Sequence, residues 1–150
     1  MDGPATHAGL GRALAATYAF LALAACARSA VQIATRFDQA PPAFLLSALS
    51  GAIYVLAAVA LSRQGRCWWV VGTVCCGLEL IGVVAVGLWS IAAPSTFPEP
   101  TVWSHFGSGY GLVPLVLPVL GLLWQRRRNP GAALRLAAQP PACPASKPLR

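Results

Sequence analysis

The sequence predicts an all-α membrane protein, a bundle of four transmembrane helices. Its composition is 57% hydrophobic and 10% charged, whereas about a quarter of the residues in a soluble domain are charged. Four long apolar runs occupy residues 13–34, 43–61, 67–92 and 103–124. About 20 helical residues at about 1.5 Å each cross a hydrocarbon core of about 30 Å. A chain of 150 residues has room for one such unit, residues 1–128.

Helix-breaking residues separate the runs. A proline pair at residues 41–42 opens the second run, where proline suits a helix start because its missing N–H would be unpaired anyway. The proline-rich segment 94–100 after the third run predicts a loop. The fourth run is polar in its first third and carries Pro114 and Pro118. Residues 129–150 are rich in Pro and Ala with scattered charge, which predicts a disordered basic tail.

Tryptophan positions support these spans. All five tryptophans lie near the ends of the third and fourth runs: Trp68, Trp69, Trp89, Trp103 and Trp124. Trp69 to Trp89 is 20 steps and Trp103 to Trp124 is 21 steps. Either spacing corresponds to about 30 Å of helix. We therefore expect the tryptophans to form two aromatic belts at the membrane surfaces.

Basic residues predict the orientation of the helices. Arg12 precedes the first run, Arg63 and Arg66 lie between the second and third, and the triplet at residues 126–128 follows the fourth. The other two connections carry little positive charge. Cytoplasmic loops of membrane proteins are enriched in Lys and Arg. We therefore expect a multi-pass protein of the plasma membrane with both termini in the cytoplasm, and we interpret the net charge of +7 as a topology signal rather than a nucleic-acid-binding surface.

The first run permits another interpretation. Leu23-Ala24-Ala25-Cys26 matches the lipobox of bacterial lipoprotein signal peptides, and the apolar stretch 13–25 behind Arg12 has signal-peptide length. Against cleavage, Asp2 lies in the preceding segment and three further spans follow. The sequence leaves open whether Cys26 is a lipidation site.

Glu79 is the main candidate functional residue, because it lies near the middle of a run that is otherwise uncharged. An acid at that depth normally faces a partner or a water-filled cavity. Arg28 and Gln32 share one face of the first helix. Measured from the start of each run, Arg28 lies about 22 Å and Glu79 about 18 Å along its helix, so the two could pair. Alternatively, Arg28 extends to the headgroups at the outer surface.

The roles open to Glu79 are proton or ion carrier, ion-pair partner, and hydrogen-bonded structural acid. Burial favours a neutral acid and a nearby arginine favours a carboxylate, so its state depends on whether Arg28 is close. We expect Cys75 and Cys76 to be small buried residues, because the chain has no C-x-x-C motif and adjacent cysteines rarely form a disulfide. No metal-ligand set or cofactor motif is recognisable.

Glycines predict two close contacts between helices. Gly107 and Gly111 have the G-x-x-x-G spacing typical of close helix packing. Glycines also recur every five residues in the third run, at positions 72, 77, 82 and 87. Because this period places them on several faces, we expect the third helix to lie at the centre of the bundle.

One segment resembles a known group of proteins. The stretch Pro98-Glu-Pro-Thr-Val-Trp-Ser-His-Phe-Gly-Ser-Gly-Tyr-Gly-Leu-Val-Pro114-Leu-Val-Leu-Pro118-Val-Leu-Gly-Leu-Leu-Trp124, followed by arginines, is similar to the last span of small four-helix integral membrane proteins of actinobacteria. The resemblance covers about residues 98–128 and the rest of the chain by layout only. It implies a membrane location and supplies no catalytic residues.

Two functions agree with these features. The first is a non-enzymatic integral membrane protein, a scaffold or accessory subunit, with the lipid bilayer, other membrane proteins or a parallel homo-oligomer as partners and without nucleic acid. The second is a small transporter that couples protons or ions through Glu79. A membrane redox enzyme is a third and weaker hypothesis, since it would need a paired-cysteine motif.

Overall fold

A computed structural model describes residues 4–94 and 99–128, and within them every regular element is helical. The elements are α1 (Pro4–Arg36), the 3-10 helix η1 (Phe37–Gln39), α2 (Pro41–Ser62), α3 (Arg66–Ala92), the 3-10 helix η3 (Ser104–Tyr110) and α4 (Val113–Arg127). The all-α prediction is confirmed. The predicted disordered tail at residues 129–150 lies outside the described residues.

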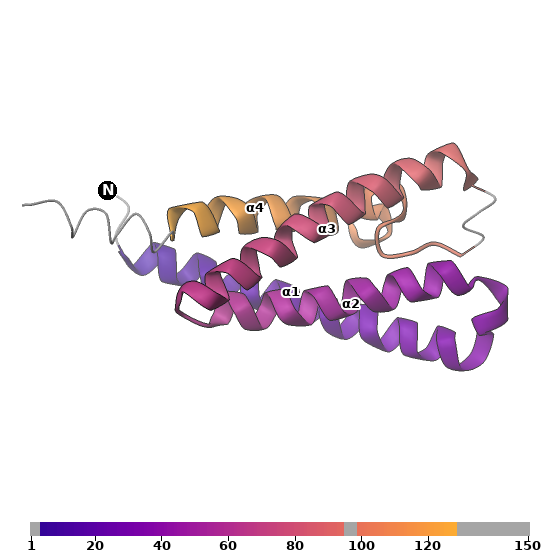
Figure 1. The fold of residues 1–150 in the computed structure, drawn as a ribbon, viewed down its shortest axis with the longest axis horizontal. Helices are drawn as coiled ribbons and strands as arrows, with labels where there is room; N and C mark the ends of the chain where they lie inside the picture. Colours follow the sequence, from indigo (N-terminus) through magenta and orange to yellow (C-terminus); the bar gives the residue numbers. More distant parts are fainter. Residues whose placement is uncertain (1–3, 95–98, 129–150) are drawn as a thin grey trace, which may run out of the picture.

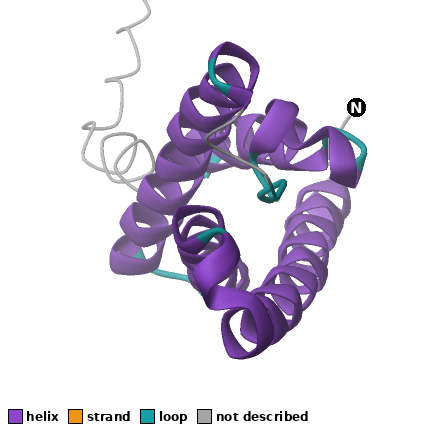
Figure 2. Ribbon diagram, turned by 90° about the vertical axis from the view of Figure 1, so that its right-hand side faces the viewer, coloured by secondary structure: helices purple, strands orange, loops and turns teal. Residues whose placement is uncertain are grey.

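The helices form a bundle around a short inserted loop. α1 and α2 pack along each other as a hairpin joined by η1, and α3 lies between α2 and the segment that contains η3 and α4 (Figure 1). Viewed from the end, the helices surround a central region into which part of the loop after α3 reaches (Figure 2). α3 contacts α2, η3 and α4, whereas α1 packs chiefly on α2.

Three helices are long and apolar enough to cross a membrane: the segment Gly9–Gln39, Pro41–Ser62 and Arg66–Ala92. Their bounds agree with the first three predicted spans, and α2 begins at the predicted proline pair. The arginine-rich connections also lie at the same end of the bundle, as the charge pattern predicts. The link between α2 and α3 lies beside the end of α4, where Arg128 donates a hydrogen bond to the Arg63 carbonyl oxygen at 3.4 Å. Which side of the membrane this end faces stays a prediction.

The fourth span differs from the expected continuous helix over residues 103–124. η3 and α4 meet at a bend of 98°, and α4 has 15 residues, or about 22 Å of helix, which is shorter than a hydrocarbon core of about 30 Å. The backbone is left-handed within η3 at Gly107, with φ of 77°, and just after η3 at Gly111, with φ of 63°. The G-x-x-x-G pair thus forms a turn, in which Gly107 contacts Pro114, and the predicted helix–helix contact is wrong.

The segment before α4 enters the bundle from one end, and we call residues 99–112 the re-entrant segment. Irregular backbone is tolerated at membrane depth only where its polar groups are paired inside the protein. Here the Thr101 hydroxyl accepts hydrogen bonds from the Trp103 and Ser104 amides at 3.2 and 3.0 Å. The Ser104 hydroxyl accepts from the Thr101 amide at 2.9 Å, and Ser90 of α3 accepts from the His105 amide at 2.9 Å.

Glycines of α3 make room for this arrangement. A methyl group at Gly82 would meet ring atoms of Trp103 at 2.8–3.0 Å, and one at Gly87 would meet Phe106 at 2.7–3.0 Å. Trp103 is consequently 3% exposed. Its predicted place in an aromatic belt is wrong, because the bend of the fourth segment carries its indole into the core.

α4 is fastened to α3 near the opposite end of the bundle. The Trp69 indole donates a hydrogen bond to the Gln125 carbonyl oxygen at 2.8 Å, and the Gln125 amide donates to the Trp69 carbonyl oxygen at 3.4 Å. Gly72 leaves space for the Gln125 side chain, which is 2% exposed. These reciprocal bonds fix how far α4 lies along α3.

Candidate functional site

Glu79 lies on the inner face of α3 and is 0% exposed. Tyr18 of α1, also 0% exposed, donates a hydrogen bond from its hydroxyl to the Glu79 Oε2 atom at 2.6 Å. Such a bond between helices is short and leaves no access for water at this oxygen. The intramembrane acid therefore ties α1 to α3.

Tyr54 brings α2 and the re-entrant segment to the same place. Its hydroxyl accepts a hydrogen bond from the Trp103 indole nitrogen at 3.0 Å and lies near the Glu79 carboxyl. The Tyr18 and Tyr54 rings pack with centroids 6.0 Å apart. Because Tyr54 uses its oxygen to accept from Trp103, its own proton remains available to the carboxyl.

One oxygen of the site is unsatisfied. Glu79 Oε1 is buried and has no hydrogen-bond partner within the described part of the chain. Buried polar atoms in proteins are paired in the large majority of cases. Tyr54, whose hydroxyl lies near the carboxyl, is the closest described candidate donor, so the two tyrosines flank the carboxyl.

Cys75 and Cys76 are small buried residues, as predicted. Cys75 is 5% and Cys76 is 0% exposed, and both are free thiols. The Cys76 sulfur lies 3.5 Å from the Tyr18 hydroxyl, and either atom can be the donor. On its other side Cys76 faces Gly121 of α4. The thiol thus extends the polar cluster toward α4.

We call Tyr18, Tyr54, Cys76, Glu79 and Trp103 the core hub. It joins three helices and the re-entrant segment through side chains that are each at most 3% exposed. Among the residues that the structure describes, no group of three or more His, Cys, Asp or Glu side chains could hold a metal ion. What the hub can do chemically is exchange hydrogen bonds among two phenols, a thiol and a carboxyl.

Arg28 does not pair with Glu79. Its guanidinium donates a hydrogen bond to the Pro100 carbonyl oxygen at 3.2 Å, so it holds the entry of the re-entrant segment instead. Tyr18, the actual partner, lies ten residues earlier in α1, which is about 15 Å of helix. The ion-pair interpretation of Glu79 is therefore wrong, while the hydrogen-bonded interpretation agrees with the structure.

Gln32 lies one turn beyond Arg28, as predicted, and not near Glu79. Both residues line an open hollow on α1 together with Thr35 and Arg36. The Gln32 Oε1 atom is buried and has no hydrogen-bond partner among the described residues. The polar stripe exists, but it lies toward the η1 end of α1 and is separate from the core hub.

Sequence reasoning missed the residues that contact Glu79. Tyr18 and Tyr54 are the tyrosines of the first and second apolar runs. Buried tyrosine hydroxyls usually find a hydrogen-bond partner, so two tyrosines and one acid among apolar runs could have been matched as a set. Trp103 could not be found this way, because its place depends on the bend between η3 and α4.

No protein-family model, curated protein or solved structure matches this chain. The resemblance to actinobacterial membrane proteins stays a prediction. Any proposal about function has to start from the geometry of the hub and of the bundle ends.

Proposed function

We propose that the protein is a non-enzymatic scaffold or accessory subunit of the plasma membrane. It would be a multi-pass protein with both termini in the cytoplasm, associated with other membrane proteins or with parallel copies of itself. The proposal rests on one observation. Glu79, the acid within the membrane-spanning helices, is fully buried and hydrogen-bonded to Tyr18, which is what a residue that holds helices together requires.

A transporter would use the acid differently. Intramembrane acids that carry protons or ions face a water-filled path or a substrate cavity. Among the described residues, Glu79 lines neither the hollow on α1 nor the cavity and groove at the end of the bundle where α1, α2 and α4 meet. Its immediate surroundings are side chains from α1, α2, α3 and the re-entrant segment, so movement of an ion to it would require these elements to separate.

The alternative function, a proton- or ion-coupled small transporter, has one specific observation in its favour. Glu79 Oε1 is buried without a hydrogen-bond partner among the described residues, and two tyrosine hydroxyls flank the carboxyl. A carboxyl with an unused acceptor can take up a proton or a cation without first losing another bond. On this hypothesis the hub would open in an alternate conformation.

Reconstitution separates the two functions. Full-length protein and a Glu79→Gln variant would be placed in liposomes, and flux down an imposed proton gradient would be measured with an internal pH-sensitive dye. Glu99→Gln is the matched control, because it makes the same chemical change outside the membrane-spanning helices. The scaffold proposal expects no flux above empty liposomes from any variant, together with a lower unfolding temperature for Glu79→Gln alone.

The scaffold role itself requires a partner of fixed stoichiometry. Chemical cross-linking in intact membranes, followed by extraction in mild detergent and quantitative mass spectrometry, should yield one defined complex or oligomer. Gradient-driven flux that Glu79→Gln abolishes without a change in unfolding temperature would reject the scaffold role and favour the transporter. A protein that stays monomeric in the cross-linked membrane would also reject it.

A further inference from the structure

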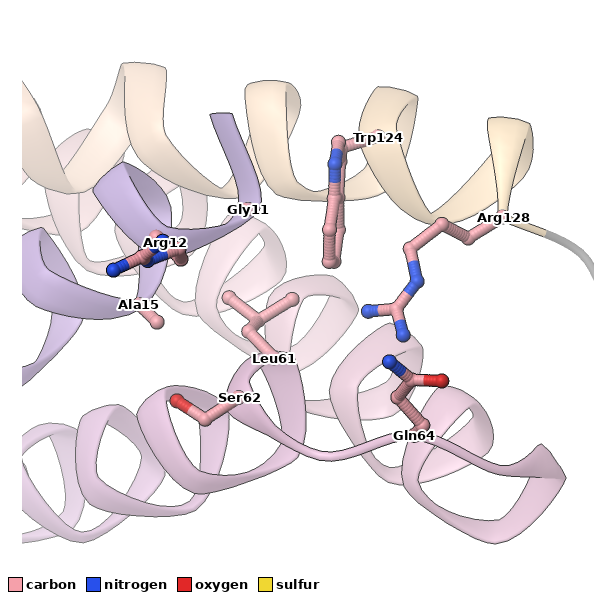
Figure 3. Close-up of a pocket in the computed structure, with 8 residues that line it drawn as sticks. All are labelled: Gly11, Arg12, Ala15, Leu61, Ser62, Gln64, Trp124 and Arg128. Carbon is pink, nitrogen blue, oxygen red and sulfur yellow. The ribbon is translucent and has the colours of Figure 1, made fainter. Parts of the chain in front are cut away.

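A cavity of about 400 Å³ opens at the end of the bundle where α1, α2 and α4 meet (Figure 3). Arg12 contributes from α1, Ser62 and Gln64 from the end of α2 and the following link, and Trp124 and Arg128 from the end of α4. This is the end that carries the arginines of the predicted cytoplasmic side. The cavity is distinct from the core hub, whose residues do not line it.

The cavity is positively charged and partly preorganised. The Arg128 guanidinium carbon lies 4.3 Å from the centroid of the Trp124 ring, and its Nη2 atom donates to the Arg63 carbonyl oxygen at 3.4 Å. These contacts leave other N–H groups of the Arg128 guanidinium for a ligand. Arg12 supplies a second cation, whose side chain points away from Arg128 (Figure 3), and no Asp or Glu is among the described residues that line the cavity.

A groove leads from the cavity along the outside of the helices. It lies between α1 and α2, has a volume of about 500 Å³, and shares Arg12, Ala15 and Ser62 with the cavity. Arg63 lies with Arg12 at its charged end, and its other walls are apolar, with Ala16 and Ala19 from α1 and Ala58 and Val59 from α2. From Arg12 to Ala19 the groove follows α1 for about 10 Å toward the middle of the membrane.

We propose that this end of the bundle binds an anionic phospholipid, with the phosphate at Arg128 beside the Trp124 ring, Arg12 as a second cation at the mouth of the groove, and part of an acyl chain in the alanine-lined groove. A guanidinium binds phosphate through paired N–H donors, and basic pockets between transmembrane helices accept anionic headgroups. Ser62 and Gln64 offer hydrogen bonds to the polar part of the headgroup. The charged cavity and the adjoining apolar groove match the headgroup and the acyl chain of a lipid. Lipid binding would be a property of the protein in addition to the scaffold role.

A free phosphate ion would use the same arginines without the groove. The phospholipid and the free ion share the phosphate group, but only the phospholipid has an acyl chain that would occupy the groove. A substitution that fills the groove should therefore weaken binding of the lipid and leave binding of inorganic phosphate unchanged.

The test measures binding of phosphatidylglycerol to full-length protein in a neutral detergent by native mass spectrometry, with phosphatidylcholine as the zwitterionic comparison. The Arg12→Gln/Arg128→Gln variant should bind phosphatidylglycerol about tenfold more weakly than the unaltered protein. Arg126→Gln/Arg127→Gln is the matched control. It removes the same charge from the same end of the bundle, at exposed residues that do not line the cavity, and should change binding less than about threefold.

A second pair of variants tests the groove and does not depend on the stability of the arginine variants. Ala19→Leu fills the groove and should reduce phosphatidylglycerol binding, whereas Ala30→Leu, at an exposed α1 position outside it, should not. Equal binding of the two lipids, or equal losses from both arginine pairs, would overturn the proposal. So would competition by inorganic phosphate together with an unaffected Ala19→Leu variant, because the site would then be one for free phosphate.

Discussion

Replacing Tyr18 with phenylalanine should destabilise the protein by about 1.5 kcal/mol. The substitution keeps the ring in its packing site and removes one hydroxyl, which donates to Glu79 Oε2 at 2.6 Å. Both side chains are 0% exposed, so water cannot replace the lost donor. A buried acceptor left unpaired costs about 1–3 kcal/mol, and single hydrogen bonds between membrane helices measure about 0.6–1.7 kcal/mol. The expected value lies where these ranges meet.

The same reasoning predicts that the pair is coupled. Glu79→Leu removes the acceptor and leaves the Tyr18 hydroxyl with only the Cys76 sulfur, 3.5 Å away. Removing both partners leaves neither group unsatisfied. The Tyr18→Phe/Glu79→Leu variant should therefore lose about 1–2 kcal/mol less than the sum of the two single changes.

The assay is reversible unfolding in mixed detergent micelles, followed by tryptophan fluorescence, for the unaltered protein, both single variants and the double variant. Tyr110→Phe, which makes the same chemical change at a half-buried position, controls for the loss of a phenol as such. It should change the free energy of unfolding by less than about 0.5 kcal/mol. Additivity of the two single changes within about 0.5 kcal/mol would refute the role of this bond.

Three further outcomes follow from the structure. Arg28→Leu should cost less than about 1 kcal/mol in unfolding assays, since it loses one bond to an exposed loop carbonyl, and its effect should add to that of any Glu79 variant; a cost of about 3–5 kcal/mol would indicate a buried ion pair after all. Gly82→Ala should destabilise by about 1–3 kcal/mol because its methyl group meets the indole of the re-entrant segment, whereas Gly77→Ala, with open space around it, should stabilise by about 0.5–1 kcal/mol, and equal effects would contradict this packing. Reporter fusions in the link between α2 and α3 should give a cytoplasmic signal and those at Glu99 an external one; the reverse would invert the predicted topology.

The apolar composition and the helix-breaking residues were sufficient to predict most of the fold. The second and third apolar runs correspond within two residues to α2 and α3. In lipid the backbone of a long apolar run has to pair its own N–H and C=O groups, so such a run between arginines or prolines forms a helix. The fourth run was ambiguous by the same criteria. Its polar first third and Pro114 were visible in the sequence, but apolar content alone does not distinguish a straight helix from a short helix preceded by a re-entrant segment.

The partner of Glu79 was missed for a geometric reason. The depth comparison with Arg28 started both helices at their first apolar residue, yet α1 begins at Pro4 and extends further at that end. The resulting shift of α1 against α3 brings Tyr18 level with Glu79 and leaves Arg28 about 15 Å beyond that level, toward the other end. Hydropathy locates a helix in the membrane only to within several residues, so it cannot choose between partners two or three turns apart.

The core hub also explains why a bundle with such an irregular fourth segment holds together. Trp103 of the re-entrant segment is buried in the core, and its indole donates a hydrogen bond to Tyr54, which lies beside the carboxyl that Tyr18 also contacts. The position of the loop is therefore specified from three helices at once through polar contacts. Apolar packing alone would favour burial of this segment without fixing its depth, because lipid and helix side chains are similarly apolar. A buried acid that accepts hydrogen bonds supplies the missing specificity, which is the role we assign to Glu79.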